Sequence, residues 1–268
     1  MIRYIRRYMG FTRCAVSRKL AYRAGLYTSI LSASISLIVS LFLWSVLFRG
    51  QSVIGGYGFR EMITYLAVVF VCNATLGNTT ERNISNRVLD GSIASDLIKP
   101  LKFLDMCLFE AMGGAFVDFL VAALSGAVII LLVGGGLPGG AGLVSALLFA
   151  VSFIMAFSLK FYISFIAGLT CFYTSNGYGV LYLRQTITDI FSGAMLPLTF
   201  YPVWFQGVAG VLPFQAAVYT PVQIFLGRLT GIDALWALVF QFFWIIATML
   251  FGTFFFTRAV RKITVHGG

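Results

Sequence analysis

Long apolar runs constrain this chain more than any other feature of its sequence. Short polar stretches separate the runs, which cover residues 26–48, 62–80, 106–133, 143–170, 179–195 and 234–257. A helix needs roughly 20 apolar residues to cross the hydrocarbon core of a bilayer. Hydrophobic residues make up 59% of the chain and charged residues only 10%, whereas about a quarter of the residues in soluble domains are charged. We therefore predict an all-α membrane protein with six transmembrane helices.

A strongly basic stretch, residues 1–24, precedes the first apolar run. Its apolar residues recur at roughly helical spacing, at Ile2, Ile5, Met9, Val16 and Leu20. This pattern is typical of an amphipathic helix that lies on the surface of a membrane. The alternative is a secretory signal peptide, but the run at 26–48 is too long for the apolar part of one, and no small-residue cleavage site follows. We interpret that run as an uncleaved first span.

The distribution of positive charge predicts the topology. Most of the 19 Lys and Arg residues lie in three places, at 1–24, 81–105 and 258–262. Because cytoplasmic loops of membrane proteins are enriched in Lys and Arg, we expect both termini and the loop 81–105 to be cytoplasmic in a bacterial inner membrane. The net charge of +10 is thereby explained without a nucleic-acid partner. The predicted domains are an interfacial helix (1–24), a transmembrane domain (25–258) and a cytoplasmic tail (259–268).

The loop 81–105 is the longest charged segment between the first and the last apolar run. Residues 83–89 have helical character, and residues 92–98 fit a second short helix that Pro100 prevents from continuing. Ile93, Leu97 and Leu101 share one face of this second helix. Such an apolar face suits either a groove on a partner protein or the surface of the bilayer, and the pattern leaves both possibilities open.

The segment 196–222, between the fifth and sixth runs, is apolar but rich in proline. Its prolines stand among aromatic and aliphatic residues, at Pro197, Pro202, Pro213 and Pro221. Proline interrupts a straight helix, so we predict short broken helices that dip back into the outer leaflet. Such segments are stable in a membrane only where protein covers their backbone. The alternative is an ordinary external loop.

Five charged residues lie in or near the predicted spans: Glu110, Asp118, Lys160, Arg184 and Asp189. An unpaired charge at the centre of a membrane costs on the order of 2.5–3.5 kcal/mol on insertion scales. We expect these residues to pair with one another and so to determine how the spans pack. The alternatives are that they line a cavity open to substrate or that they form a proton relay.

Sites for catalysis, metals and nucleotides are not evident in the sequence. The glycine-rich stretch 134–142 lacks the lysine of a phosphate-binding loop, and no hydrolase motif is present. The cysteines are widely scattered, at Cys14, Cys72, Cys107 and Cys171, so neither a disulfide framework nor a metal site is predicted. His266 is expected to be a solvated residue of the tail. We predict no enzymatic activity.

Two motifs and the basic first segment carry a resemblance to a known family. The motifs are VLDGSIASDLIKPL at residues 88–101 and SGAMLPLTFYPVWFQGVAGVLPF at 192–214. With the basic N-terminal helix, they resemble the six-span permease subunits of ABC-type exporters, in the same order along the chain. The resemblance implies a coupling helix in loop 81–105, outer re-entrant helices after the fifth span, and an interfacial helix that also touches the ATPase.

The same resemblance implies partners and site residues. ATP and Mg²⁺ would be bound by a separate ATP-binding subunit, and a second copy or a related permease would complete a pathway for an amphipathic drug, lipid or peptide. The predicted coupling residues are Leu89, Gly91, Ile93, Asp96, Leu97, Lys99 and Pro100. The predicted outer-gate residues are Pro197, Phe200, Pro202, Trp204, Pro213 and Phe214. The alternative function is a self-sufficient secondary carrier driven by a proton or ion gradient.

Overall fold

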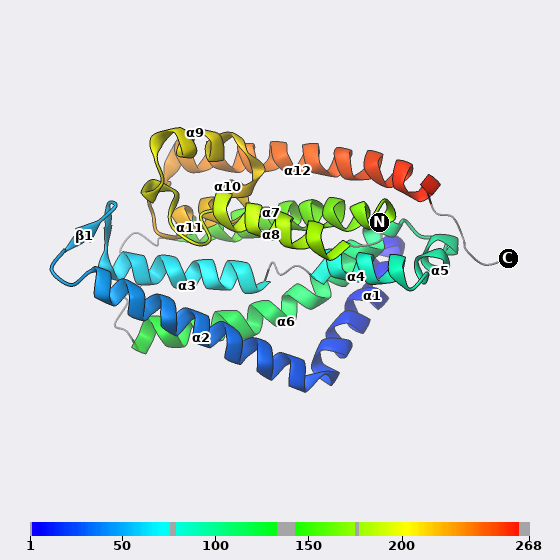
Figure 1. Cartoon of the computed structure of the whole chain (residues 1–268), viewed down its shortest axis with the longest axis horizontal. Helices are drawn as coiled ribbons and strands as arrows, with labels where there is room; N and C mark the ends of the chain where they lie inside the picture. Colours follow the sequence, from blue (N-terminus) through cyan, green and yellow to red (C-terminus); the bar gives the residue numbers. More distant parts are fainter. Residues whose placement is uncertain (1, 76–78, 133–142, 175–176, 263–268) are drawn as a thin grey trace.

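The computed structural model describes residues 2–75, 79–132, 143–174 and 177–262 (Figure 1). The helices at the predicted spans are α2 (Arg23–Leu47), α3 (Phe59–Thr75), α6 (Phe103–Leu132), α7 (Leu143–Leu169), α8 (Gly177–Phe191) and α12 (Gly231–Ala259). The other α-helices are α1 (Ile2–Ala21), α4 (Thr79–Leu89), α5 (Ile93–Ile98), α9 (Val203–Val211), α10 (Pro213–Ala217) and α11 (Tyr219–Phe225). Single 3₁₀ turns are η1 (Thr170–Phe172), η2 (Leu198–Phe200) and η3 (Val260–Lys262).

Most of the long helices run lengthwise through the molecule (Figure 1). The central helix α7 contacts α12, α4 and α11, while α6 contacts α1 and α3. Helix α5 and the C-terminal end of α12 lie at one end, and α9, α10, α11 and the β-hairpin lie toward the other (Figure 1). We call these the α5 end and the hairpin end.

Among the described residues, four helical segments are long and apolar enough to cross a membrane: Phe59–Leu89, Phe103–Val128, Leu143–Phe172 and Gly231–Ala259. They correspond to the second, third, fourth and sixth predicted spans. The 15 residues of α8 make a helix about 22 Å long, shorter than a hydrocarbon core of about 30 Å. Helix α8 ends earlier than predicted because Gly193, with φ +75°, takes the left-handed conformation that terminates helices. The first and fifth spans remain predictions.

The start of the predicted loop 81–105 is helical and packs on the bundle. Helix α4 occupies residues that the sequence assigns to the end of the second span and the start of the loop 81–105, and it packs against α7. Glu81 and Ser85 of α4 are buried. Glu81, the first residue of the predicted loop, is thus inside the bundle, where it meets Arg184 and does not need water.

A small β-hairpin departs from the all-α prediction. It joins β1 (Val53–Ile54) to β2 (Tyr57–Gly58), with Ile54 opposite Tyr57. Gly55 and Gly56 have φ of +58° and +82°, values that suit the tight two-residue turn of a hairpin. Tyr57 is fully buried, so the hairpin is attached to the helices by an aromatic anchor.

The apolar core has one cluster near each end of the bundle. The cluster toward the hairpin end includes Tyr57, Met62, Tyr65 and Leu159. The cluster toward the α5 end gathers side chains of α1, α4, α5, α6 and α7, among them Tyr8, Ile84, Ile93, Phe103 and Phe165. This second cluster is the base on which the candidate site is built.

Candidate functional site

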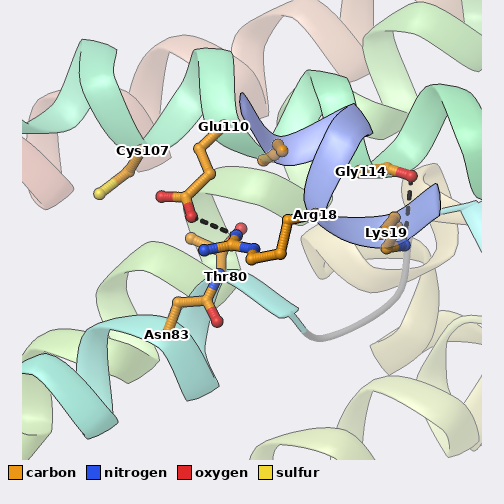
Figure 2. Close-up of a pocket in the computed structure, with 9 residues that line it drawn as sticks. Arg18, Lys19, Thr80, Asn83, Cys107, Glu110 and Gly114 are labelled. Atoms are coloured by element: carbon orange, nitrogen blue, oxygen red, sulfur yellow. Dashed lines mark hydrogen bonds and ion pairs between the residues drawn. The ribbon is translucent and has the colours of Figure 1, made fainter. Parts of the chain in front are cut away.

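Helix α1 is fixed to α6 by ion pairs. Arg18 donates from Nη2 to Glu110 Oε1 at 2.6 Å, and Lys19 pairs with Asp118 and also donates to the Gly114 carbonyl oxygen (Figure 2). Glu110 and Asp118 are two turns apart on α6, as their spacing in the sequence indicates. The prediction that the charges of the spans pair with one another is wrong for these two residues, because their partners come from α1 and α4.

The backbones of α1 and α6 approach closely at Gly113. A Cβ atom at Gly113 would clash with the Thr12 carbonyl oxygen and lie 3.0 Å from the Cβ of Ala15. Thr12 Oγ1 donates to the Phe109 carbonyl oxygen at 2.9 Å. These two contacts fix the position of α1 along α6, in addition to any contact with lipid.

The buried face of α1 differs from the predicted one. Tyr8 and Ala15 are buried, and the Tyr8 ring stacks on Phe109 with centroids 5.3 Å apart. Met9 and Leu20, which the periodicity assigns to the apolar face, are 43% and 53% exposed. The face that packs on the protein combines aromatic and small residues, because α6 offers an aromatic ring and a glycine notch there.

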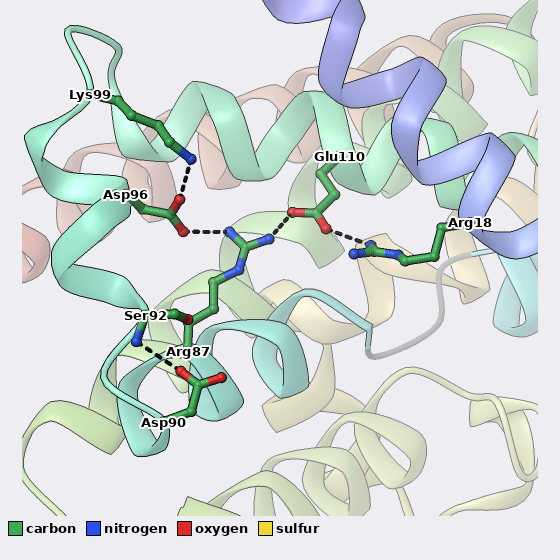
Figure 3. A network of polar contacts seen from close by, with 7 residues as sticks. All are labelled: Arg18, Arg87, Asp90, Ser92, Asp96, Lys99 and Glu110. Atoms are coloured by element: carbon green, nitrogen blue, oxygen red, sulfur yellow. Dashed lines mark hydrogen bonds and ion pairs between the residues drawn. The ribbon is translucent and has the colours of Figure 1, made fainter.

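A chain of ion pairs connects four helices at the α5 end (Figure 3). Lys99 Nζ lies 2.6 Å from Asp96 Oδ1, and Asp96 Oδ2 lies 3.3 Å from Arg87 Nη1. Arg87 Nη2 in turn lies 2.5 Å from Glu110 Oε2, and the other oxygen of Glu110 accepts from Arg18. We name Lys99, Asp96, Arg87, Glu110 and Arg18 the ionic chain. It links α5 to α4, α6 and α1.

Burial makes the middle of the ionic chain stronger than its ends. The side chains of Glu110 and Asp96 are 11% and 13% exposed, whereas that of Arg18 is 60% exposed. Ion pairs open to water contribute about 0–1 kcal/mol, and partly desolvated pairs couple more strongly. The pairs of Arg87 with Asp96 and Glu110 therefore hold α5 against α6.

Helix α5 is bounded as the sequence predicts. Gly91 has φ +76°, and Lys99 is extended before Pro100. The Ser92 amide donates to Asp90 Oδ1 at 2.9 Å, and the hydrogen bonds from Ser92 lower the pKa of the exposed Asp90 carboxyl. This local turn sets the direction in which α5 leaves α4.

The apolar face of α5 points into the protein. Ile93 is buried, and Leu97 and Leu101 pack against the same cluster. The prediction that this face meets a partner or the bilayer is therefore wrong for Ile93, because the apolar cluster at the α5 end of the bundle already covers it, and Leu97 and Leu101 are half-buried. Outward-facing apolar side chains are instead Ile98, 84% exposed, and Leu89, 50% exposed. Of the other predicted coupling residues, Gly91, Lys99 and Pro100 are exposed, and Asp96 belongs to the ionic chain.

The remaining charges of the spans lie where α4, α7 and α8 meet. Arg184 Nη2 donates to Glu81 Oε1 at 2.7 Å, and Arg184 Nε lies 2.6 Å from Glu81 Oε2. Lys160 is buried and donates to Asn73 Oδ1 at 3.1 Å. Asp189 is half-buried one helical turn beyond Arg184. Arg184 is one of the five charged residues predicted in or near the spans, but its partner Glu81 is not one of them.

The segment after α8 forms short helices, as predicted. Pro197 is buried, Phe200, Pro213 and Phe214 are half-buried, and Pro202 and Trp204 are exposed on the surface of the chain. The Phe200 ring packs edge-on to Trp44, with centroids 5.4 Å apart, and lies against Gly55 of the hairpin.

Side-chain amides satisfy carbonyl groups that the broken helices leave free. Gln206 donates to the Tyr201 carbonyl oxygen at 2.8 Å, and Gln215 donates to that of Gly210 at 2.9 Å. Gln241 of α12 is fully buried and donates to the Ala216 carbonyl oxygen at 2.7 Å. An irregular backbone is stable in an apolar environment when protein groups satisfy it in this way.

Sequence reasoning missed the partners of the charged residues. The sequence places Arg18 and Lys19 in an interfacial helix and Glu81 and Arg87 in a cytoplasmic loop, and their partners lie far away in the sequence. On one helix, a partner of Arg87 would be sought four positions away, at residues 83 and 91. That rule does not indicate Glu110. Within the described ranges, no group of three or more His, Cys, Asp or Glu side chains is placed to hold a metal ion.

Comparison with known proteins gives a match over most of the chain. A family model described as ABC-2 family transporter protein matches residues 34–267. The match leaves α1 and the start of α2 outside. We found no curated protein that matches the chain.

Proposed function

The chain belongs to the ABC-2 family of transporter proteins and is an ABC-type permease subunit, and we propose that it forms the export pathway of an ATP-driven transporter. The family is a membrane transport component and is not itself catalytic. ATP and Mg²⁺ would be bound by a separate ATP-binding subunit. A second copy of this chain, or a related permease, would complete the pathway.

The ionic chain is the observation that carries this proposal. A permease must convert the movement of an external subunit into movement of its spans. Helix α5 is short, stands at the end of the bundle and presents Ile98 outward, and Leu89 at the end of α4 is exposed as well. The ionic chain joins the opposite side of α5 to α6, a long apolar helix. A force on α5 would therefore be transmitted to a span through Arg87.

We propose that α5 is the coupling helix and that α1 moves with it. Binding of ATP can change the conformation of the permease only if the ATP-binding subunit contacts the two conformations differently. Leu89 at the end of α4 and Ile98, Lys99 and Pro100 at the end of α5 offer such contacts because all four are exposed. Helix α1 is seated on α6 and shares Glu110 with Arg87, so it would shift together with α6.

At the hairpin end, we propose that the short helices η2 to α11 form the outer gate. The ring of Phe200 lies between Trp44 and the hairpin, and carbonyl groups of the segment are bound by glutamine side chains. Rearrangement of these contacts would open the pathway without exposing unpaired backbone groups to lipid. Trp204 and Pro202 would face lipid or the second permease.

The proposed topology places the α5 end in the cytoplasm of a bacterium and gives the chain six spans. This orientation is supported by basic residues of α1, α4, the end of α12 and the residue after α5, namely Arg18, Lys19, Arg87, Arg258 and Lys99. The exposed faces of the long helices are rich in Phe and Leu, which favours an amphipathic substrate such as a drug, a lipid or a peptide.

Co-purification tests the proposal directly. The tagged chain is extracted gently from its native membrane, and the accompanying proteins are identified by mass spectrometry. We expect an ATP-binding subunit, and we expect the complex in nanodiscs to hydrolyse ATP faster than the isolated subunit. Recovery of the chain without any ATP-binding protein would support a self-sufficient carrier instead.

Two variants of α5 then test the coupling role. We expect Ile98→Ser to reduce co-purification of the ATP-binding subunit, because it removes an exposed apolar contact. We expect Asp96→Asn to keep the complex intact but to reduce the stimulation of ATP hydrolysis, because it weakens the ionic chain. Val53→Ser is the matched control, since it removes a 60%-exposed aliphatic side chain at the opposite end. Wild-type stimulation in both α5 variants would refute the role of α5.

A further inference from the structure

A cavity lies beside the ionic chain, enclosed by α1, α4 and α6 (Figure 2). Its volume is about 330 Å³, which is enough for a group much larger than a few water molecules. The residues that line it are Ala15, Arg18, Lys19, Thr80, Asn83, Cys107, Glu110, Ala111 and Gly114. Transmission of force through α5 does not require this space.

The charge of the lining favours an anion. Arg18 and Lys19 contribute two positive charges and Glu110 one negative charge, while Lys19 is paired with Asp118 behind the lining; with Arg87, three cations meet two carboxylates. The carboxylate of Glu110 is already bound on both oxygens, by Arg18 and by Arg87. Arg87 thus reduces the repulsion that Glu110 would exert on a bound anion. An arginine carries five N–H donors, so Arg18 keeps donors beyond the one used for Glu110.

Neutral hydrogen-bonding groups complete the lining. Thr80 is 7% exposed, and neither its hydroxyl nor the side-chain amide of Asn83 forms a hydrogen bond with another described residue. Figure 2 shows Asn83 pointing from α4 toward Arg18, with Thr80 beside them. Both groups line the cavity and can donate a hydrogen bond into it, so they favour a ligand that accepts hydrogen bonds.

We propose that this cavity binds an anionic phosphate group. Phosphate oxygens accept hydrogen bonds from several directions, which suits donors that converge from two helices. The apolar remainder of the lining, Ala15, Ala111 and Gly114, accommodates the carbon atoms next to such a group. The phosphate belongs either to the headgroup of an anionic lipid or to a free phosphate compound. This inference does not depend on the proposed export function.

Melting temperatures of the purified full-length chain in a neutral detergent measure the binding. The chain is titrated with phosphatidylglycerol, with phosphatidylcholine of the same acyl chains, and with inorganic phosphate. We expect phosphatidylglycerol to stabilise the chain more than phosphatidylcholine. Competition by millimolar inorganic phosphate would identify a site for free phosphate compounds, and lack of competition would identify a lipid headgroup site.

Variants distinguish this site from general attraction of anions to a basic surface. Thr80→Val combined with Asn83→Leu leaves the net charge unchanged, and we expect it to weaken binding about tenfold or more, because hydrogen bonds to a charged group are lost. Arg18→Gln is expected to weaken binding as well, while Arg258→Gln, which removes a charge outside the cavity, should not. Wild-type affinity in the double variant, or equal stabilisation by both lipids, would overturn the proposal.

Discussion

The ion pair between Glu81 and Arg184 allows a quantitative test of the structure. The two side chains are only 3% and 9% exposed and meet through two short contacts between α4 and α8. Two unit charges about 4 Å apart interact by about 4 kcal/mol at an effective dielectric constant of about 20. Removal of one partner from a buried pair typically costs about 3–5 kcal/mol, because the other charge stays buried without compensation.

We therefore expect Arg184→Met to lower the free energy of unfolding by about 3–5 kcal/mol. Glu81→Met should have an effect of similar size. The double variant should lie close to the wild type, because apolar side chains of similar volume often replace a buried ion pair without loss. Reversible unfolding by sodium dodecyl sulfate, followed through tryptophan fluorescence, measures these free energies and their coupling.

The pair of Arg228 with Glu61 is the matched control. Its atoms are 3.0 Å apart, but the side chains are 29% and 48% exposed. Exposed pairs have coupling energies of about 0.2–1 kcal/mol. Arg228 also lies over the Tyr57 ring, and the double-mutant cycle cancels the loss of that contact. A coupling between Glu81 and Arg184 no larger than that of the control pair would refute the reasoning.

Two further predictions concern helix packing. Gly113→Ala should destabilise the chain by about 1–3 kcal/mol, because the new Cβ meets the Thr12 carbonyl oxygen, whereas Gly114→Ala, whose Cβ would lie 3.6 Å from the nearest described atom, should be neutral or slightly stabilising in the same unfolding assay. Gln241→Leu should cost about 1–3 kcal/mol, because it leaves the buried Ala216 carbonyl group without its donor; an unfolding free energy equal to that of the wild type would show that this hydrogen bond is dispensable.

Local structure followed closely from the sequence wherever one side chain or a short pattern decides the conformation. Gly91 and Pro100 delimit α5 because only glycine takes a positive φ easily and proline cannot continue a helix. Pro197, Pro202 and Pro213 stand at the starts of η2, α9 and α10 for the same reason. The long apolar runs form long helices, since a bilayer leaves no other way to satisfy their backbone.

Burial was harder to predict for helices that carry both polar and apolar residues. The stripe of Ile93, Leu97 and Leu101 was identified correctly, but its periodicity does not say whether the chain itself or another surface covers it. Helix α4 raised the same difficulty, because Glu81 has the composition of a solvated loop and yet is buried against Arg184. The hydrophobic pattern describes one element, whereas burial depends on which other elements pack against it.

The sequence by itself determined the class of protein, the long apolar helices, the boundaries of α5 and the family to which the chain belongs. Only the tertiary structure decided the partners of the charged residues. Arg18 meets Glu110 across 92 residues, and Arg184 meets Glu81 across 103. A charged residue in an apolar run needs an opposite charge, and the sequence shows which residues have this need. Which partner is within reach depends on helix packing, which joins segments that no local pattern connects.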